Sequence, residues 1–258
     1  MDITESDLFK KILSGAIDNG EKPNFDIFEN CEIHGQWQYM KDIDNDPNKT
    51  ICINASCPDC MVENKVKKIM GDSGIQKRFL KCTFENYHAD NENSLAIKNR
   101  LIGYCNKFKT ILENGNNLIL SGSVGTGKTH LSCAIANEIA KNGFTSVFRT
   151  LSEISSMVHN AKSFDAEKNV EQVMRSLVEV DLLIIDEVGA VAEKDNAVLF
   201  DVINARYAEN KPMIILTNLD SDNLQREIGA RSFDRLAHSG VYLTLAWNSY
   251  RRKKNVEF

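Results

Sequence analysis

The stretch that decides the fold is Gly122-Ser123-Val124-Gly125-Thr126-Gly127-Lys128-Thr129, which matches the pattern G-x-x-x-x-G-K-[ST]. It follows a short apolar run at 117–120 and precedes a helical pattern over 128–141. Glycines let backbone N–H groups surround a phosphate, and the start of the helix adds partial positive charge. We expect all eight residues to bind ATP, with Lys128 on the β- and γ-phosphates and the Thr129 hydroxyl on Mg²⁺.

The chain on either side of this stretch alternates between apolar runs and helical patterns. Apolar runs at 182–185 and 213–216 are interpreted as strands, as are the stretches 146–150 and 241–245. Helical patterns lie at 152–161, 168–179 and 195–208. Apolar strands without polar alternation, separated by helices, are typical of a parallel sheet covered on both faces. The sequence therefore predicts an α/β fold.

Polar residues follow two of the predicted strands. Asp186 and Glu187 close the run 182–185, and Asn218 follows the run 213–216. We expect Asp186 to hold Mg²⁺ and Glu187 to polarise the attacking water, which favours hydrolysis over phosphoryl transfer to a second substrate. Asn218 is predicted to orient that water. The alternative for the acidic pair is a helix cap after the strand.

Two arginines, Arg231 and Arg235, lie four residues apart on one predicted helical face, with Asp234 between them. An arginine can neutralise transition-state charge on the phosphate of a neighbouring subunit. This spacing suits such a role for Arg231. It also suits a surface helix with a salt bridge, and the spacing alone leaves both open.

The amino-terminal part carries a separate signal. Cys31-x-x-His34 and Cys57-Pro58-Asp59-Cys60 are two close pairs of metal-ligand residue types, and paired ligands on tight turns build tetrahedral Zn²⁺ sites. We expect Cys31, His34, Cys57 and Cys60 to bind structural zinc, with Cys52 as a possible substitute ligand. A scattered set of reduced cysteines is the alternative. Cys82, Cys105 and Cys133 are interpreted as small buried residues.

Charge distribution suggests how the chain is organised. Residues 1–60 carry 12 acidic and 5 basic side chains, whereas residues 61–116 carry 6 and 10. The basic stretch, with Lys65, Lys67, Lys68, Lys77, Arg78 and Lys81, is either a DNA-phosphate contact or a solvated helix face. Apolar spacing over 4–17 predicts an amphipathic helix, for partner docking or for internal packing.

Composition excludes some classes of protein. The net charge of −5 argues against a protein dominated by a basic surface. No run approaches the ~18 apolar residues that a membrane span needs, and the amino terminus does not resemble a signal peptide. We therefore expect a soluble, cytoplasmic protein.

From about residue 79 onward the sequence resembles the DnaC-like replicative helicase loaders, a branch of the AAA+ ATPases. Lys81-Cys82-Thr83-Phe84-Glu85-Asn86-Tyr87 is similar to their F-x-N-Y segment. The stretches 122–129 and 182–187 resemble their Walker A and Walker B motifs, and Asn218 falls at the sensor 1 position. The run from Gly229 to Leu236 matches their G-x-R-x-x-D-R motif, and Trp247-Asn248-Ser249-Tyr250-Arg251 matches their ending.

This resemblance implies roles for single residues. Arg231 would be the arginine finger acting on a neighbouring subunit, and Arg251 the nucleotide-sensing sensor 2 residue. Few residues follow the last predicted strand, so the helical lid of AAA+ proteins would be truncated. The IstB-like transposition ATPases share most of the same motifs.

The expected function follows from motifs and resemblance together. We expect an ATPase that self-associates through AAA+ interfaces, binds a DnaB-type hexameric helicase and places it on single-stranded DNA at replication initiation. Its parts would be a zinc-binding, helicase-interacting module at 1–62, a basic helical linker at 63–80 and the AAA+ domain at 81–258. The alternatives are an IstB-like transposition ATPase and a zinc-dependent adaptor with an ATP-sensing AAA+ switch.

Overall fold

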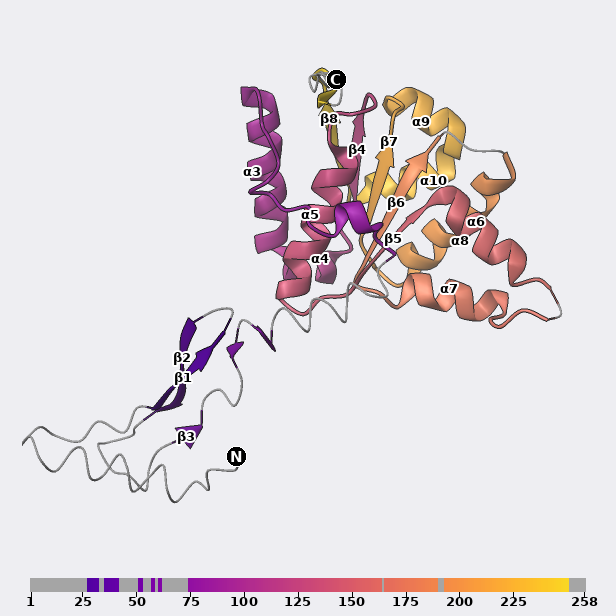
Figure 1. The fold of residues 1–258 in the computed structure, drawn as a ribbon. Coiled ribbons are helices and arrows are strands. Elements are labelled where there is room, and N and C mark those ends of the chain that lie inside the picture. The colour runs from indigo at the N-terminus through magenta and orange to yellow at the C-terminus, as the bar shows by residue number, and fades with distance from the viewer. Residues whose placement is uncertain are drawn as a thin grey trace, which may run out of the picture. The chain divides into compact units, whose positions relative to one another are not determined.

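The protein is described here by a computed structural model, which covers residues 27–32, 35–41, 51–52, 57–58, 60–61, 74–163, 165–189 and 193–250. Its internal contacts divide the chain into two units, residues 1–64 and residues 65–258 (Figure 1). Among the described residues, no helix combines the length and apolar character needed to cross a bilayer.

The described part of the first unit is a small antiparallel sheet. β1 (Ile27–Cys31) and β2 (Gly35–Lys41) form a hairpin in which Cys31 pairs with Gly35, and β3 (Ile51–Cys52) pairs with β2. Gly35 has a φ of 80°, in the left-handed region that glycine enters without steric cost. The hairpin therefore places Cys31 at the edge of a tight turn.

The second unit is built on a five-stranded parallel sheet, which confirms the fold class expected from the apolar runs. The strand order is β5-β6-β7-β4-β8. The strands are β4 (Leu118–Gly122), β5 (Ser146–Thr150), β6 (Leu182–Val188), β7 (Met213–Thr217) and β8 (Val241–Leu245).

Helices cover both faces of this sheet (Figure 1). One face packs against α3 (Glu92–Asn106), α4 (Phe108–Asn114) and α5 (Lys128–Lys141), after the short 3₁₀ turn η2 (Lys77–Phe79). The other face packs against α6 (Leu151–Asn160), α7 (Val170–Val178), α8 (Glu193–Ala208), α9 (Ser221–Ile228) and α10 (Ala230–His238).

Strand residues alternate between the two cores, as the pleat requires. Leu118 and Leu120 belong to the first core and Ile119 to the second, and all three are at most 2% exposed. Burial on both faces explains why β4, β6 and β7 contain uninterrupted apolar runs.

The strand order determines where the site lies. β7 is inserted between β4, which leads into the glycine-rich loop, and β6, which ends at the acidic pair. All strands are parallel, so their carboxyl ends meet at one edge of the sheet, where α/β proteins bind ligands. Asn218, directly after β7, therefore lies between the other two elements.

A buried arginine stabilises the end of the sheet that lies opposite the phosphate loop. Arg206 of α8 is fully buried, and burial lowers its pKa. Its guanidinium donates hydrogen bonds to the backbone carbonyls of Leu177, Val178, Val180, Asp181 and Pro212. It thereby satisfies carbonyls at the end of α7 and beside the starts of β6 and β7.

Candidate functional site

The glycine-rich loop, residues 122–127, joins β4 to α5 and has the backbone shape of an anion cradle. Gly125 and Gly127 have φ values of 84° and 95°, in the region that favours glycine. A Cβ atom on Gly127 would lie 2.6 Å from the Tyr87 ring, so a side chain has no room there. The loop therefore needs glycine for both conformation and space.

Lys128 is the first residue of α5 and is 8% exposed. Its Nζ donates to the carbonyls of Gly122 at 2.5 Å and Ser123 at 3.0 Å, and to Asn218 Oδ1 at 2.7 Å. The positive charge is thus held at the mouth of the loop. Asn218, which the sequence predicts to orient water, touches the lysine that is expected to bind phosphate.

Thr129 and Asp186 lie together at the same edge. The Thr129 hydroxyl donates to Asp186 Oδ2 at 2.8 Å, although 57 residues separate them. Hydroxyl and carboxylate oxygens are the ligands that Mg²⁺ prefers. The pair would fit a magnesium ion beside the phosphate loop, and that role of Thr129 and Asp186 stays a prediction.

Glu187 is placed by an irregularity in β6. The register between β6 and β7 shifts between Ile185 and Val188, and Glu187 has a φ of 62°, uncommon for a residue other than glycine. Its backbone N–H donates to Asp186 Oδ1 at 2.7 Å, and its side chain is exposed. Bulges of this kind redirect side chains next to active sites.

The turn after β7 is held on several sides. The Leu219 carbonyl accepts hydrogen bonds from Ser121 Oγ at 2.6 Å and from the Tyr242 hydroxyl at 3.1 Å. The Thr217 hydroxyl donates to the Val188 carbonyl at 2.8 Å and accepts from the Leu219 N–H. This network fixes the backbone around Asn218.

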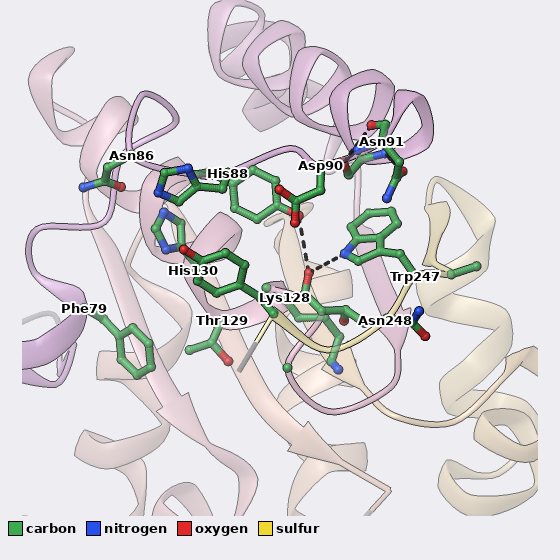
Figure 2. A pocket seen from close by; sticks show the side chains of 17 residues that line it. Phe79, Asn86, His88, Asp90, Asn91, Lys128, Thr129, His130, Trp247 and Asn248 are labelled. Carbon is green, nitrogen blue, oxygen red and sulfur yellow. Dashed lines mark hydrogen bonds between the residues drawn. The ribbon is translucent and has the colours of Figure 1, made fainter. Parts of the chain in front are cut away.

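A cavity of ≈ 470 Å³ opens beside the loop (Figure 2). Its walls are the loop, the segment that precedes α3 and the segment that follows β8. His88 and Tyr250 stack across the two segments, with ring centroids 5.6 Å apart and an interplanar angle of 8°. The sequence motifs did not single out His88 or the neighbouring Asp90 and Asn91 as lining residues.

The segment that precedes α3 is anchored to α5. The Asn86 side chain accepts from Thr83 N–H and donates to the Lys81 carbonyl at 2.6 Å, which closes a turn. The Thr83 carbonyl lies 3.0 Å from His130 Nε2 of α5, and burial lowers the pKa of His130. Phe84 is 4% exposed. These contacts give Phe84 and Asn86 of the F-x-N-Y segment structural roles beside α5.

Arg231 lies in the first turn of α10, after Gly229, and is exposed. Among the contacts of the described residues, none joins Arg231 to the phosphate loop of its own chain. Arg235 instead lies over the rings of Phe200 and Tyr207, at 5.7 and 5.8 Å. The two arginines therefore have different surroundings, one exposed and one against aromatic rings.

Three of the four predicted zinc ligands gather in the first unit. The Sγ atoms of Cys31, Cys57 and Cys60 lie within 4.8 Å of one another, and those of Cys31 and Cys60 are 3.5 Å apart. Sulfur atoms around a tetrahedral Zn²⁺ are about 3.8 Å apart. The hydrogen bond between the Cys31 and Cys60 thiols raises the pKa of Cys60 to about 12. The cluster fits a thiolate-binding metal.

Several predicted features lie outside the described residues. These are His34, Arg251, the side chain of Cys52, the helix expected over 4–17 and residues 63–73 of the basic linker. Within the described part, Lys77, Arg78 and Lys81 are exposed. Cys82, Cys105 and Cys133 are buried, as expected.

Comparison with known proteins places this geometry in a family context. The family profile described as IstB-like ATP binding protein matches residues 64–257. The replicative helicase loader DnaC of Buchnera aphidicola subsp. Baizongia pistaciae is 32% identical over 194 residues, 73% of this chain and 77% of that protein. The YdaV protein of Escherichia coli strain K12, which has no functional name, is 34% identical over 190 residues, 72% and 75% of the two chains.

Solved structures share the fold. A crystal structure of the DnaC helicase loader matches with a TM-score of 0.60 at 20% identity, covering 66% of this chain and 99% of that one. DnaA from Aquifex aeolicus bound to AMPPCP matches with a TM-score of 0.52 at 26% identity, covering 66% and 52%. The sheet and loop thus have the architecture of AAA+ proteins, one of them solved with an ATP analogue.

Proposed function

We propose that this chain, which belongs to the family of IstB-like ATP-binding proteins and is a P-loop ATPase, loads a DnaB-type hexameric helicase onto single-stranded DNA in the cytoplasm. The observation that carries this proposal is the 32% identity to a replicative helicase loader over 73% of the chain. The family profile, which matches residues 64–257, extends through the whole site, including Trp247 and the segment that precedes α3.

We assign hydrolysis to residues at the carboxyl edge of the sheet. Loop N–H groups from Gly122 to Thr129 and the Lys128 ammonium would hold the phosphates of ATP, and Thr129 and Asp186 would hold Mg²⁺, which neutralises phosphate charge when bound. Glu187, exposed beside them, would accept a proton from the attacking water, and Asn218 would orient that water. Arg251 would contact the nucleotide from the carboxyl-terminal segment.

Assembly would complete the site. Arg231 is exposed and makes no described contact with its own loop, which suits a residue that acts on the ATP of a neighbouring subunit. We therefore propose self-association through AAA+ interfaces, with Arg231 as the finger.

We propose that the first unit is a structural zinc module for helicase recognition, joined by a basic linker to the ATPase. Cys31, Cys57 and Cys60 would be three ligands and His34 the fourth, with Cys52 as substitute. Metal binding would supply the stability that a segment of this size cannot obtain from an apolar core. The domain limits proposed are 1–62, 63–80 and 81–258.

Replacing Cys60 by serine tests the zinc module. We expect about one zinc ion per chain in the wild type and almost none in Cys60→Ser, because a serine hydroxyl does not replace a thiolate ligand. Zinc content is measured by elemental analysis of the purified full chain. Cys82→Ala, which removes a thiol outside the cluster, should keep its zinc. A metal-free wild-type protein, or a Cys60→Ser protein with full zinc, would contradict the assignment.

Co-elution with a DnaB-type helicase from the same genome tests the loader function. We expect the full chain to form a complex with the helicase on size exclusion in the presence of ATP, and a chain lacking residues 1–62 to lose it. A truncated chain that still hydrolyses ATP would show that the loss is not due to unfolding. Absence of a complex with the intact, ATP-binding chain would refute helicase loading.

A second candidate function is that of a transposition ATPase, because the matching family is described as IstB-like. Filaments on duplex DNA, without helicase binding, would support this function. The third possibility, an ATP-sensing adaptor, predicts negligible turnover with and without DNA.

A further inference from the structure

Two carbonyl groups of the phosphate loop are held by donors from outside the loop. The Thr126 carbonyl accepts from the Tyr87 hydroxyl at 3.3 Å and from the Trp247 indole N–H at 3.0 Å. The Gly125 carbonyl accepts from the backbone N–H of Tyr250 at 2.9 Å. In Figure 2 a dashed line joins the Trp247 indole to the Thr126 carbonyl oxygen. One donor segment precedes α3 and the other follows β8.

These bonds determine where the loop amides point. In a trans peptide, the carbonyl oxygen and the N–H of the next residue point in opposite directions, and none of the described peptides is cis. Holding the Thr126 carbonyl toward Tyr87 and Trp247 therefore turns the Gly127 N–H away from them. Holding the Gly125 carbonyl does the same for the Thr126 N–H. Successive N–H groups on one side form an anion-binding concavity.

The burial of Tyr87 and the packing of the two donor segments suit these hydrogen bonds. Tyr87 is 7% exposed, and its ring leaves no room for a Cβ on Gly127. Burial raises the pKa of Tyr87 to about 12, so its hydroxyl keeps its proton and donates throughout the neutral range. The stacked rings of His88 and Tyr250 join the two donor segments.

We propose that Tyr87 and Trp247 are positioning residues of the ATPase site, which hold the Thr126 carbonyl so that the Gly127 N–H faces the phosphates. They act through the loop and not by touching the transferred phosphoryl group. This role rests on the P-loop ATPase activity alone and holds whether the chain serves a helicase or a transposase.

Both side chains also line the cavity, so a contact with the nucleotide base is the competing explanation. The two explanations differ for a ligand that has phosphates and no base. A residue that shapes the loop affects inorganic tripolyphosphate and ATP alike, whereas a base contact affects ATP only.

The test uses Tyr87→Phe, Trp247→Phe and the double variant in the full chain. Affinities for Mg²⁺·ATP and for Mg²⁺·tripolyphosphate are measured by displacement of a fluorescent ATP analogue. We expect each single variant to lose about 2–10-fold, because one donor remains, and the double variant roughly 10–100-fold. The loss of affinity should be equal for the two ligands. Without its donors, the Thr126–Gly127 peptide turns toward solvent, and either ligand must turn it back on binding.

Tyr104→Phe is the matched control, because the Tyr104 hydroxyl is buried and has no hydrogen-bond partner among the described residues. It should leave both affinities unchanged. The melting temperature without ligand separates positioning from simple stabilisation. Unchanged affinities in the double variant, with or without a lower melting temperature, would overturn the proposal. Loss for ATP alone would assign both residues to the base. If the double variant does not fold, the single variants decide by the same comparison.

Discussion

A Lys128→Ala protein is expected to lose ATP hydrolysis by at least roughly 10²–10³-fold while keeping its fold. Lys128 is the cation held at the mouth of the loop, 2.7 Å from Asn218 and within hydrogen-bond distance of two loop carbonyls. In a site with little water, a positioned charge stabilises developing negative charge far more than it does in solution. Steady-state phosphate release measures the loss.

Lys141→Ala is the control for this variant. Lys141 lies on the same helix, α5, and pairs with Glu138 on the surface at 2.8 Å. Exposed pairs of this kind contribute about 0–1 kcal/mol, so neither the melting temperature nor hydrolysis should change much. If Lys128→Ala kept more than a tenth of wild-type turnover, the phosphate role of Lys128 would be wrong.

Much of the fold could be predicted because its signals are local. β4, β6 and β7 each contain a short, uninterrupted apolar run, because these strands are buried on both faces. The glycine-rich stretch is also identifiable because a strand pattern precedes it and a helical pattern follows it. In contrast, α3 was not predicted, because Ser94, Leu101 and Cys105 are its only buried residues in the described structure, and its apolar period is weak.

Outside the glycine-rich motif and the cysteine pairs, site residues could be predicted where they directly follow a strand. Asp186 and Asn218 were found in this way, because parallel strands bring their carboxyl ends together. The contacts of Thr126 with Tyr87 and Trp247 span 39 and 121 residues, and no local pattern encodes such pairings. Arg206 shows the same limit, because its sequence context gives no sign that it is buried and hydrogen-bonded to five backbone carbonyls.

An Arg231→Ala protein is expected to lose roughly 10³–10⁵-fold in hydrolysis by the assembled protein, the effect seen when a trans-acting arginine is absent. The exposed position of Arg231 at the start of α10 leaves it available to a second subunit. Its own ATP site would remain intact. Nucleotide affinity of the isolated subunit should therefore change little, which a binding titration checks.

Mixing two inactive variants gives the sharpest test of action in trans. Lys128→Ala subunits carry an intact Arg231 and a disabled site, whereas Arg231→Ala subunits carry an intact site and no finger. In an assembly of head-to-tail interfaces, a site is active when its own subunit has Lys128 and the neighbouring subunit has Arg231. Random mixing at equal amounts meets both conditions at about a quarter of all sites. Hydrolysis should therefore return toward that fraction of the wild-type rate.

The control for this experiment is Arg226→Ala, which removes an exposed arginine on the adjacent helix α9 that donates to Asn223 at 3.1 Å. This variant should hydrolyse ATP at the wild-type rate, because Arg226 has no partner across the interface in our assignment. A fully active Arg231→Ala protein would refute the finger. A mixture that assembles and stays inactive would show that Arg231 acts within its own chain, because only a residue supplied by a neighbour can be restored by mixing.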